Sequence, residues 1–354
     1  MAGSEYNFSS RFLHRLALQS RMMAEISFDA ENALVGKKTG SSSDNPVFIS
    51  GLARAGTTIL MRYLYESGEF RSLTYQDMPF VLMPNLWKKF SARREAGEYK
   101  ERAHKDGIMV SFESPEAFEE VFWRVFTGAE YIKKDRLKLQ KVSSEVLGKF
   151  RDYIHNVIVS ADNPSQTRYL SKNNNNILRL PYLFKAFPNA RIVIPFRDPL
   201  QHAVSLLSQH IHFSKIQSKD KFSLDYMNWL GHFEFGLNQK PFYFSDNDTF
   251  MKLDKSDKMK LDFWLHSWKN YYEFALNNVG DNTILFSYSE LCKSPSTVLS
   301  KLFKELNVSH TPVDLKPFNP PEKEISGYSE TLLKECMDIY KNLELTFNSW
   351  YLKG

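Results

Sequence analysis

The chain has 354 residues, of which 42% are hydrophobic, so it is long and apolar enough to bury a sizeable core. Its formal net charge of +5 comes from basic residues that are spread along the chain and form no basic tail. This mild charge suits a small polyanionic ligand and argues against nucleic acid as a partner. The two cysteines, Cys292 and Cys336, have neither metal-ligand nor disulfide-framework spacing, which indicates a reducing compartment and no bound metal.

The amino-terminal segment is predicted to be helical. Residues 12–34 carry apolar side chains at helical spacing, and residues 37–45 form a polar, serine-rich connector. The first 20 residues lack the uninterrupted apolar core of a secretion signal, and no later run is long enough to cross a bilayer. We therefore expect residues 1–45 to be an N-terminal helical extension of a cytoplasmic protein without a transmembrane segment.

Residues 47–59, with the sequence VFISGLARAGTTI, combine a short β-branched run, a glycine-rich turn and the start of an apolar helix. The turn lies between Gly51 and Gly56, and the helix after it would point backbone N–H groups and its positive end at one anion. The lysine of nucleoside-triphosphatase loops is missing, and Arg54 supplies a cation from within the turn instead. The segment predicts a site for a phosphate-like group, and the alternative is a structural strand-to-helix turn.

The segments after this turn alternate between predicted strands and helices. Residues 58–65, 117–126 and 142–158 have the apolar spacing of helices, and residues 70–73 have the pattern of a short strand. Residues 88–107 are strongly charged, which predicts a solvated helix or loop, or alternatively a mobile lid.

Residues 191–209, with the sequence RIVIPFRDPLQHAVSLLSQ, repeat the pattern of a strand that ends on charge and leads into a helix. Asp198 is predicted to cap this helix and Pro199 fits its first turn, so Arg197 is expected at the mouth of the turn. Pro195 removes a backbone donor, and we expect it to mark the last paired position of the strand. Taken alone, the segment is also compatible with an ordinary capped helix.

The last part of the chain adds further helices and one strand. Residues 222–237 and 261–277 have helical spacing and are separated by residues 239–260, a polar insertion with little core-forming potential. Residues 283–286 form a third β-rich run, and residues 317–354 are predicted to be a C-terminal packing helix. The succession of strand and helix pairs predicts an α/β fold with a central, mostly parallel sheet flanked by helices.

The two predicted anion motifs, in this order, resemble those of the sulfotransferases that use 3′-phosphoadenosine 5′-phosphosulfate (PAPS). The bacterial and tyrosylprotein-sulfotransferase-like branches are the most similar. A late Tyr-x-Glu-Leu plus Pro element of that family is matched by Tyr288, Glu290, Leu291 and Pro295. The resemblance implies a P-loop-like, three-layer sulfotransferase fold, with residues 46–316 as the sulfotransferase α/β domain.

The resemblance also implies two sets of residues that bind PAPS as a co-substrate. The 5′-phosphosulfate would lie on the glycine-rich turn, and the 3′-phosphate at the start of the second helix. The first set is Arg54, Ala55, Gly56, Thr57 and Thr58, and the second is Arg197 and Ser205.

Catalytic roles follow from the same resemblance. Arg54 and Lys172 match positions that neutralise charge on the phosphosulfate and its bridging oxygen, although Lys172 is alternatively a surface lysine. Asp77 lies near the position of the carboxylate base of the related branch, displaced by a residue or two, and is alternatively a helix cap. His104 is the second candidate for the base, because histidine has this role in other sulfotransferase branches.

The implied function is in-line transfer of a sulfuryl group from PAPS to a hydroxyl of a carbohydrate, lipid or small metabolite, without a metal ion. Two other classes stay open: a P-loop-type metabolite kinase with a degenerate loop, and a non-catalytic nucleotide-binding module. Transfer from labelled PAPS in EDTA would exclude the kinase, and transfer to any acceptor would exclude the module. No motif in the sequence indicates the identity of the acceptor or the oligomeric state.

Overall fold

The computed structural model describes residues 8–36, 45–91, 100–101, 109–110, 114–309, 315–317 and 325–352. The strands are β1 Val47–Ile49, β2 Phe70–Arg71, β3 Lys100–Glu101, β4 Met109–Val110, β5 Leu137–Lys138, β6 Arg168–Lys172, β7 Arg191–Phe196, β8 Phe242–Tyr243 and β9 Thr283–Ser287. The helices before β7 are α1 Phe8–Gln19, α2 Arg21–Val35, α3 Thr57–Tyr65, η2 Tyr75–Asp77, α4 Pro84–Phe90, α5 Glu120–Phe126, α6 Ser144–Val159, η3 Asn174–Leu178 and α7 Leu180–Ala186. The helices after β7 are α8 Pro199–Gln217, α9 Lys221–Leu230, α10 Asp248–Asp254, α11 Leu261–Asn277, α12 Tyr288–Lys293, α13 Pro295–Glu305 and α14 Glu330–Tyr351.

Five strands form the central sheet in the order β2-β6-β1-β7-β9, and every pair in it is parallel. The short strand β1 lies in the middle, with Val47 paired to Leu170 of β6 and to Arg191 of β7. Because all strands run the same way, the carboxyl ends of β1, β6, β7 and β9 lie along the same edge of the sheet. The loops that carry the two predicted anion motifs both leave the sheet at this edge.

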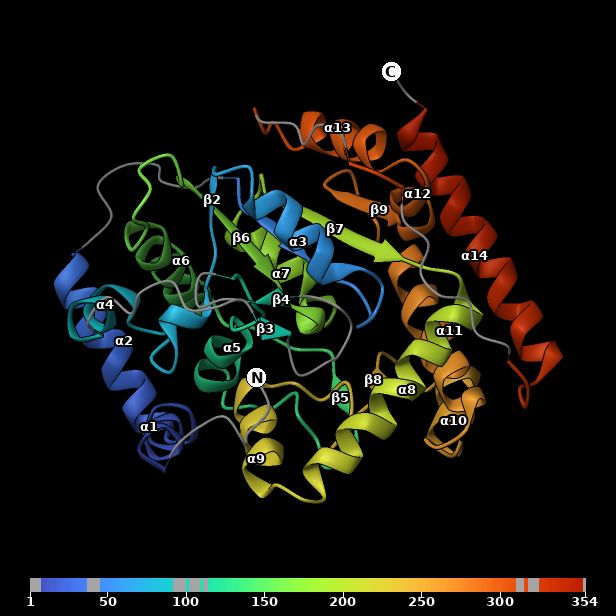
Figure 1. The fold of residues 1–354 in the computed structure, drawn as a ribbon, viewed down its shortest axis with the longest axis horizontal. Coiled ribbons are helices and arrows are strands. Elements are labelled where there is room, and N and C mark those ends of the chain that lie inside the picture. The colour runs from blue at the N-terminus through green and yellow to red at the C-terminus, as the bar shows by residue number, and fades with distance from the viewer. Residues whose placement is uncertain are drawn as a thin grey trace.

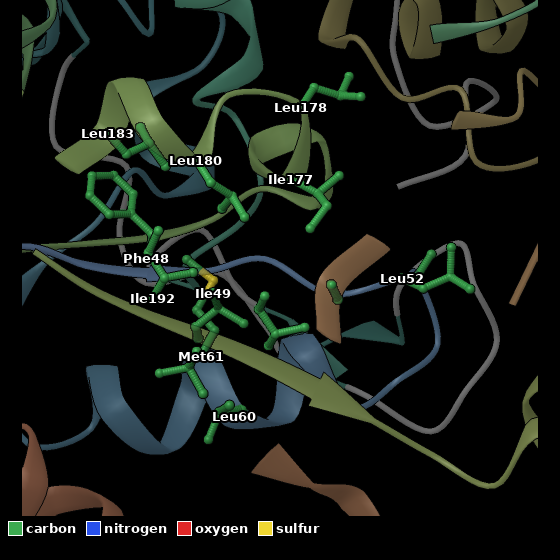
Figure 2. Close-up of a cluster of buried hydrophobic side chains, with 14 of the residues drawn as sticks. Phe48, Ile49, Leu52, Leu60, Met61, Ile177, Leu178, Leu180, Leu183 and Ile192 are labelled. Carbon is green, nitrogen blue, oxygen red and sulfur yellow. The ribbon is translucent and has the colours of Figure 1, made fainter. Parts of the chain in front are cut away.

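Helices cover both faces of the sheet, which is the three-layer α/β fold that the sequence predicts. Figure 2 shows Leu60 and Met61 of α3 on one side of the strands and Leu180 and Leu183 of α7 on the other. All three residues of β1 are fully buried between these layers. A strand buried on both faces needs a continuous apolar run, and the VFI of β1 meets this requirement.

The two ends of the chain add helices to the edges of these layers. The predicted helix over residues 12–34 is divided into α1 and α2, because Ser20 accepts a hydrogen bond from the backbone N–H of Met23 and so caps a new helix. α2 packs against α4, α5 and α6, and α14 packs along α11 and β9 (Figure 1). Phe28 of α2 and Phe347 of α14 belong to the same buried apolar cluster as the sheet.

The expectation that Pro195 ends its strand is wrong. β7 continues to Phe196, and both Pro195 and Phe196 pair with β9. On the other side of β7, pairing with β1 ends earlier, with the Ser50 amide donating to the Val193 carbonyl at 2.9 Å. The nitrogen of Pro195 faces this side, where no strand needs a donor, so proline is tolerated inside β7.

The expectation that residues 239–260 have little core-forming potential is also wrong. This segment forms β8 and α10, and it buries Phe242, Phe244, Phe250 and Leu253. Most of the polar residues of this segment are exposed, and only these few aromatic and aliphatic side chains are buried. Its composition is therefore the same as that of a solvated loop, and composition alone does not predict its buried part.

Candidate active site

The loop from Ser50 to Gly56 joins the end of β1 to the start of α3, as the sequence predicts. Gly56 occupies the position before the helix with φ +89°, and no side chain caps the helix. A Cβ on Gly56 would lie 2.4 Å from the Tyr288 ring, and one on Gly51 would lie 2.9 Å from Pro195 Cγ. Glycine is therefore required at both positions, at Gly56 by backbone conformation as well as space.

The residues predicted to bind the 5′-phosphosulfate lie in this loop and in the first turn of α3. Thr57 and Thr58 are buried at the first turn of α3, where the backbone N–H groups of a helix end can bind an anion. The amide of Ala55 donates to the Leu52 carbonyl at 3.2 Å, so it helps to close the loop. Arg54 adopts a left-handed backbone conformation with φ +74°, which is uncommon for a residue with a side chain.

The second predicted anion motif has the local structure that its sequence indicates. Asp198 is the N-cap of α8 and accepts from the Gln201 amide at 2.9 Å, with Pro199 in the first turn. Arg197 lies just before this cap, and its guanidinium is 5.2 Å from the centre of the Tyr288 ring. Burial lowers the pKa of Arg197, and the charge of Arg54 adds to this shift.

The two motifs meet at one place. Arg54 Nε donates to the Ser205 hydroxyl at 3.2 Å, across 151 positions of sequence. His202, also on α8, hydrogen-bonds the Ala53 carbonyl through Nε2 at 2.7 Å, so the first loop is bound to the second helix twice. Burial, followed by the charges of Arg197 and Arg54, lowers the pKa of His202 to about 3, so this imidazole is neutral and Nε2 carries the proton.

Lys172 is the last residue of β6, in register with Ile49 at the end of β1. Its ammonium lies 3.7 Å from Glu116 Oε1, and both side chains are about nine-tenths buried. Glu116 also accepts from the Tyr75 hydroxyl at 3.1 Å and from the Ala117 amide at 2.9 Å. Lys172 is therefore a buried, ion-paired residue beside the Ser50–Gly56 loop and not a surface lysine.

Comparison with known proteins gives the family of this chain. The sequence model of the family described as "Sulfotransferase family" matches residues 46–240, which is more than half of the chain. The chain belongs to the sulfotransferase family. It is thus a sulfuryl-transfer enzyme, and no curated protein matches it over its sequence.

Several solved bacterial sulfotransferases are similar to this sulfotransferase in structure. STF9 from Mycobacterium avium is 14% identical, with 93% of this chain and 75% of that chain covered and a TM-score of 0.47. STF1 from Mycobacterium tuberculosis H37Rv is 12% identical, with 94% and 83% covered and a TM-score of 0.49. A sulfotransferase from Alicyclobacillus acidocaldarius is 14% identical, with 89% and 98% covered and a TM-score of 0.37.

The two candidate bases of this sulfotransferase are placed differently. Asp77 is buried in the capping box of η2, where Oδ2 accepts from the Thr74 amide at 2.7 Å and Oδ1 pairs with Arg71 Nη2 at 2.7 Å. Each carboxylate oxygen of Asp77 therefore has a protein donor. His104 lies outside the described residues, so its role stays a prediction.

Neither a metal cluster nor a membrane span is found in the described ranges. No three His, Cys, Asp or Glu side chains there are grouped so that they could hold a metal ion. None of the helices there combines the length and apolar character needed to span a membrane.

A second, partly buried charge pair lies close to Lys172, and nothing in the sequence pattern indicates it. His232 Nδ1 is 3.5 Å from Glu234 Oε2, and Asn174 donates to the other oxygen of Glu234 at 2.7 Å. Burial opposes charge on both partners, but their mutual attraction raises the pKa of His232 and lowers that of Glu234 to about 2. The charged groups of Lys172 and Glu116 both act on His232, so the four side chains form one electrostatic cluster.

The His232–Glu234 pair predicts a pH-dependent contribution to folding stability. The raised pKa of His232 stabilises the fold below its ordinary value of 6.5, and this is lost as pH rises through the folded value. The lowered pKa of Glu234 stabilises the fold above its ordinary value of 4.5, and this is lost as pH falls towards about 2. Glu234→Gln should therefore lower the free energy of unfolding most between these two ordinary values, by on the order of 2 kcal/mol.

Urea unfolding of both proteins at a series of pH values checks this prediction, with the exposed Glu145→Gln as a matched control. The difference between wild type and Glu234→Gln should shrink on both sides of the window. A difference that is constant with pH would contradict the pairing.

Proposed function

We propose that this sulfotransferase transfers the sulfuryl group of PAPS to a hydroxyl acceptor that is a carbohydrate, a lipid or a small metabolite. The observation that supports the donor most directly is the contact of Arg54, from the first anion motif, with Ser205, from the second. One nucleotide with a phosphosulfate at one end and a 3′-phosphate at the other would engage both motifs at once.

The residues present fit such a donor. The uncapped end of α3 and the two buried threonines offer donors to the 5′-phosphosulfate, with Ala55 and Gly56 shaping the turn. Arg197 and Ser205 would hold the 3′-phosphate. Arg197 is partly buried near the like charge of Arg54, which costs free energy, and a bound anion would offset this cost.

The bound donor would supply an activated sulfuryl group on a phosphate oxygen. Lys172 would donate to the bridging oxygen as negative charge builds there, and Arg54 would neutralise charge on the phosphosulfate. Asp77 and His104 are the candidates for the base that the sequence resemblance proposes. The proposed reaction uses no metal ion, because cationic side chains supply the positive charge.

We also propose that residues 46–316 form the catalytic α/β domain, with residues 1–45 as a helical extension and residues 317–354 as a packing helix. The extension supports this division because α1 contacts mainly α2 and α9, away from the edge where the motifs meet. α14 supports it by packing on α11 and α8, behind the second motif.

The assignment of Arg197 to the 3′-phosphate predicts a loss of nucleotide affinity. Arg197→Ala should weaken the binding of 3′-phosphoadenosine 5′-phosphate (PAP) by at least ~1 kcal/mol, as expected for loss of a charged hydrogen-bond donor. Isothermal calorimetry with PAP measures this change. Arg191→Ala is a suitable control, because Arg191 lies at the opposite end of β7 and pairs with Glu305. Equal affinity of Arg197→Ala and wild type would contradict the assignment.

A further inference from the structure

Lys172 and Glu116 form a buried pair in which a cation and a carboxylate lie close together. Lys172 Nζ lies 3.7 Å from Glu116 Oε1, which is close enough for attraction and longer than a tight hydrogen bond. The second oxygen of Glu116 accepts from the neutral Tyr75 hydroxyl at 3.1 Å. In contrast, Asp77 forms a 2.7 Å ion pair with Arg71 and accepts two hydrogen bonds from Thr74.

The backbone places this pair at the mouth of the anion loop. Ile49 immediately precedes the loop, is in register with Lys172, and accepts a 2.9 Å hydrogen bond from the Asn173 amide. The Glu116 amide donates to the Leu73 carbonyl at 3.0 Å, just beyond β2. Glu116 therefore lies at the same edge of the sheet as the loop, over the ends of β2 and β6.

A buried polar network holds the two segments together. The Asn173 side chain donates to Glu119 at 3.2 Å and to Glu120 at 2.7 Å, and the Asn176 side chain donates to Glu119 at 3.0 Å. Glu119 and Glu120 lie at the start of α5, three and four residues after Glu116, while Asn173 directly follows Lys172. The network thus ties the segment of Glu116 to the end of β6 and sets the separation of the ion pair.

We propose that Glu116 is the general base of this sulfotransferase, in place of Asp77 or His104, and that Lys172 holds its carboxylate until the donor binds. The inference rests on the proposed PAPS-dependent function and names a residue of that same site. As the bond from the acceptor oxygen to sulfur forms and the bond from sulfur to the bridging oxygen of the donor breaks, the acceptor proton would pass to Glu116. The electron pair of the broken bond would stay on the bridging oxygen, whose charge Lys172 would stabilise.

This arrangement has a consequence for nucleotide binding that does not depend on the acceptor. In the free protein the ammonium of Lys172 is paired with the Glu116 carboxylate. A nucleotide phosphate that binds Lys172 must therefore compete with this carboxylate. The negative charge of Glu116 also repels the phosphate. Removing this charge should therefore strengthen the binding of PAP, whereas loss of a merely structural carboxylate should weaken it or leave it unchanged.

The experiment compares wild type, Glu116→Gln and Asp77→Asn by calorimetry with PAP and by initial rates with radiolabelled PAPS and a panel of hydroxyl acceptors. We expect Glu116→Gln to bind PAP at least about threefold more tightly and to lose roughly 10²–10⁴-fold in kcat. Asp77→Asn should lose less in kcat than Glu116→Gln does, and the exposed Glu145→Gln should keep both kcat and PAP affinity within about threefold. Thermal melting checks that the variants are folded. Tyr75→Phe is a milder variant, because it removes only the hydrogen bond from the Tyr75 hydroxyl to Glu116. The fall of kcat at low pH should then begin at a higher pH, because this hydrogen bond favours the charged form of Glu116.

Several outcomes would overturn the inference. It fails if Glu116→Gln retains the wild-type kcat, if its PAP affinity is unchanged or weaker, or if His104→Ala alone abolishes transfer. The proposed function fails separately, and takes this inference with it, if wild type does not bind PAP. If wild type binds PAP and transfers sulfate while Glu116→Gln does the same, only the assignment of Glu116 is wrong.

Discussion

Lys172→Met should lower kcat by roughly 10²–10³-fold while PAP affinity falls by less than about tenfold. The ammonium of Lys172 is buried beside the end of β1, where the bridging oxygen of the donor would lie, and charge on that oxygen builds mainly in the transition state. Methionine keeps most of the side-chain volume, so packing around β6 is preserved. The split between a large change in kcat and a small change in affinity is the signature of a group that acts on the transition state.

Initial rates with labelled PAPS and calorimetry with PAP measure the two quantities. Lys185→Met is the control, because Lys185 is an exposed residue in the last turn of α7 and should leave both unchanged. Thermal melting of Lys172→Met is needed as well, since the substitution leaves Glu116 without its cation. A Lys172→Met protein with normal kcat would remove Lys172 from the chemistry.

Arg179→Met should destabilise the fold by about 3–5 kcal/mol, because it leaves a buried carboxylate without its partner. Arg179 is fully buried and donates to both oxygens of Glu120, at 2.7 and 2.8 Å. It also donates to Gln140 and lies over the Trp123 ring. Burial is the largest influence and by itself would lower the pKa of Arg179, but the charge and hydrogen bonds of Glu120, together with Tyr131 and Glu119, raise the pKa overall.

Guanidinium unfolding followed by circular dichroism gives the free energies. The double variant Arg179→Met with Glu120→Gln should recover part of the loss, because it removes the unpaired charge. Lys341→Met, at an exposed pair with Asp338, should change stability by no more than about 0.5 kcal/mol. A loss for Arg179→Met as small as that of the control would show that the buried pair has little net effect on stability.

Local patterns were enough to predict the two motifs and the type of sheet. The glycines at 51 and 56 and the Asp198–Pro199 start of α8 act within a few residues, so their structural effect can be predicted from sequence spacing. The apolar runs of β1 and β7 have the composition of strands buried on both faces, which predicts a parallel sheet.

Contacts between distant segments could not be predicted in this way. Nothing in the Asn173–Asn176 run indicates that two of its amides bind the carboxylates of Glu119 and Glu120. Glu116 has the sequence context of a helix start, whereas α5 begins only at Glu120, which leaves Glu116 on a loop that reaches Lys172. The order of the strands decides these contacts, because it places β6 beside β1 although more than a hundred residues separate them.

The sequence by itself determined the glycine-rich turn between β1 and α3, the capped helix of the second motif and the parallel α/β sheet, because each depends on backbone geometry and apolar spacing within one segment. Only the tertiary structure decided that Arg54 meets Ser205, that Lys172 is paired with Glu116 and that Asp77 is held by Arg71. The physical reason is that these contacts need charged side chains from remote segments to be desolvated together, and their partners are set by chain topology and not by neighbouring residues.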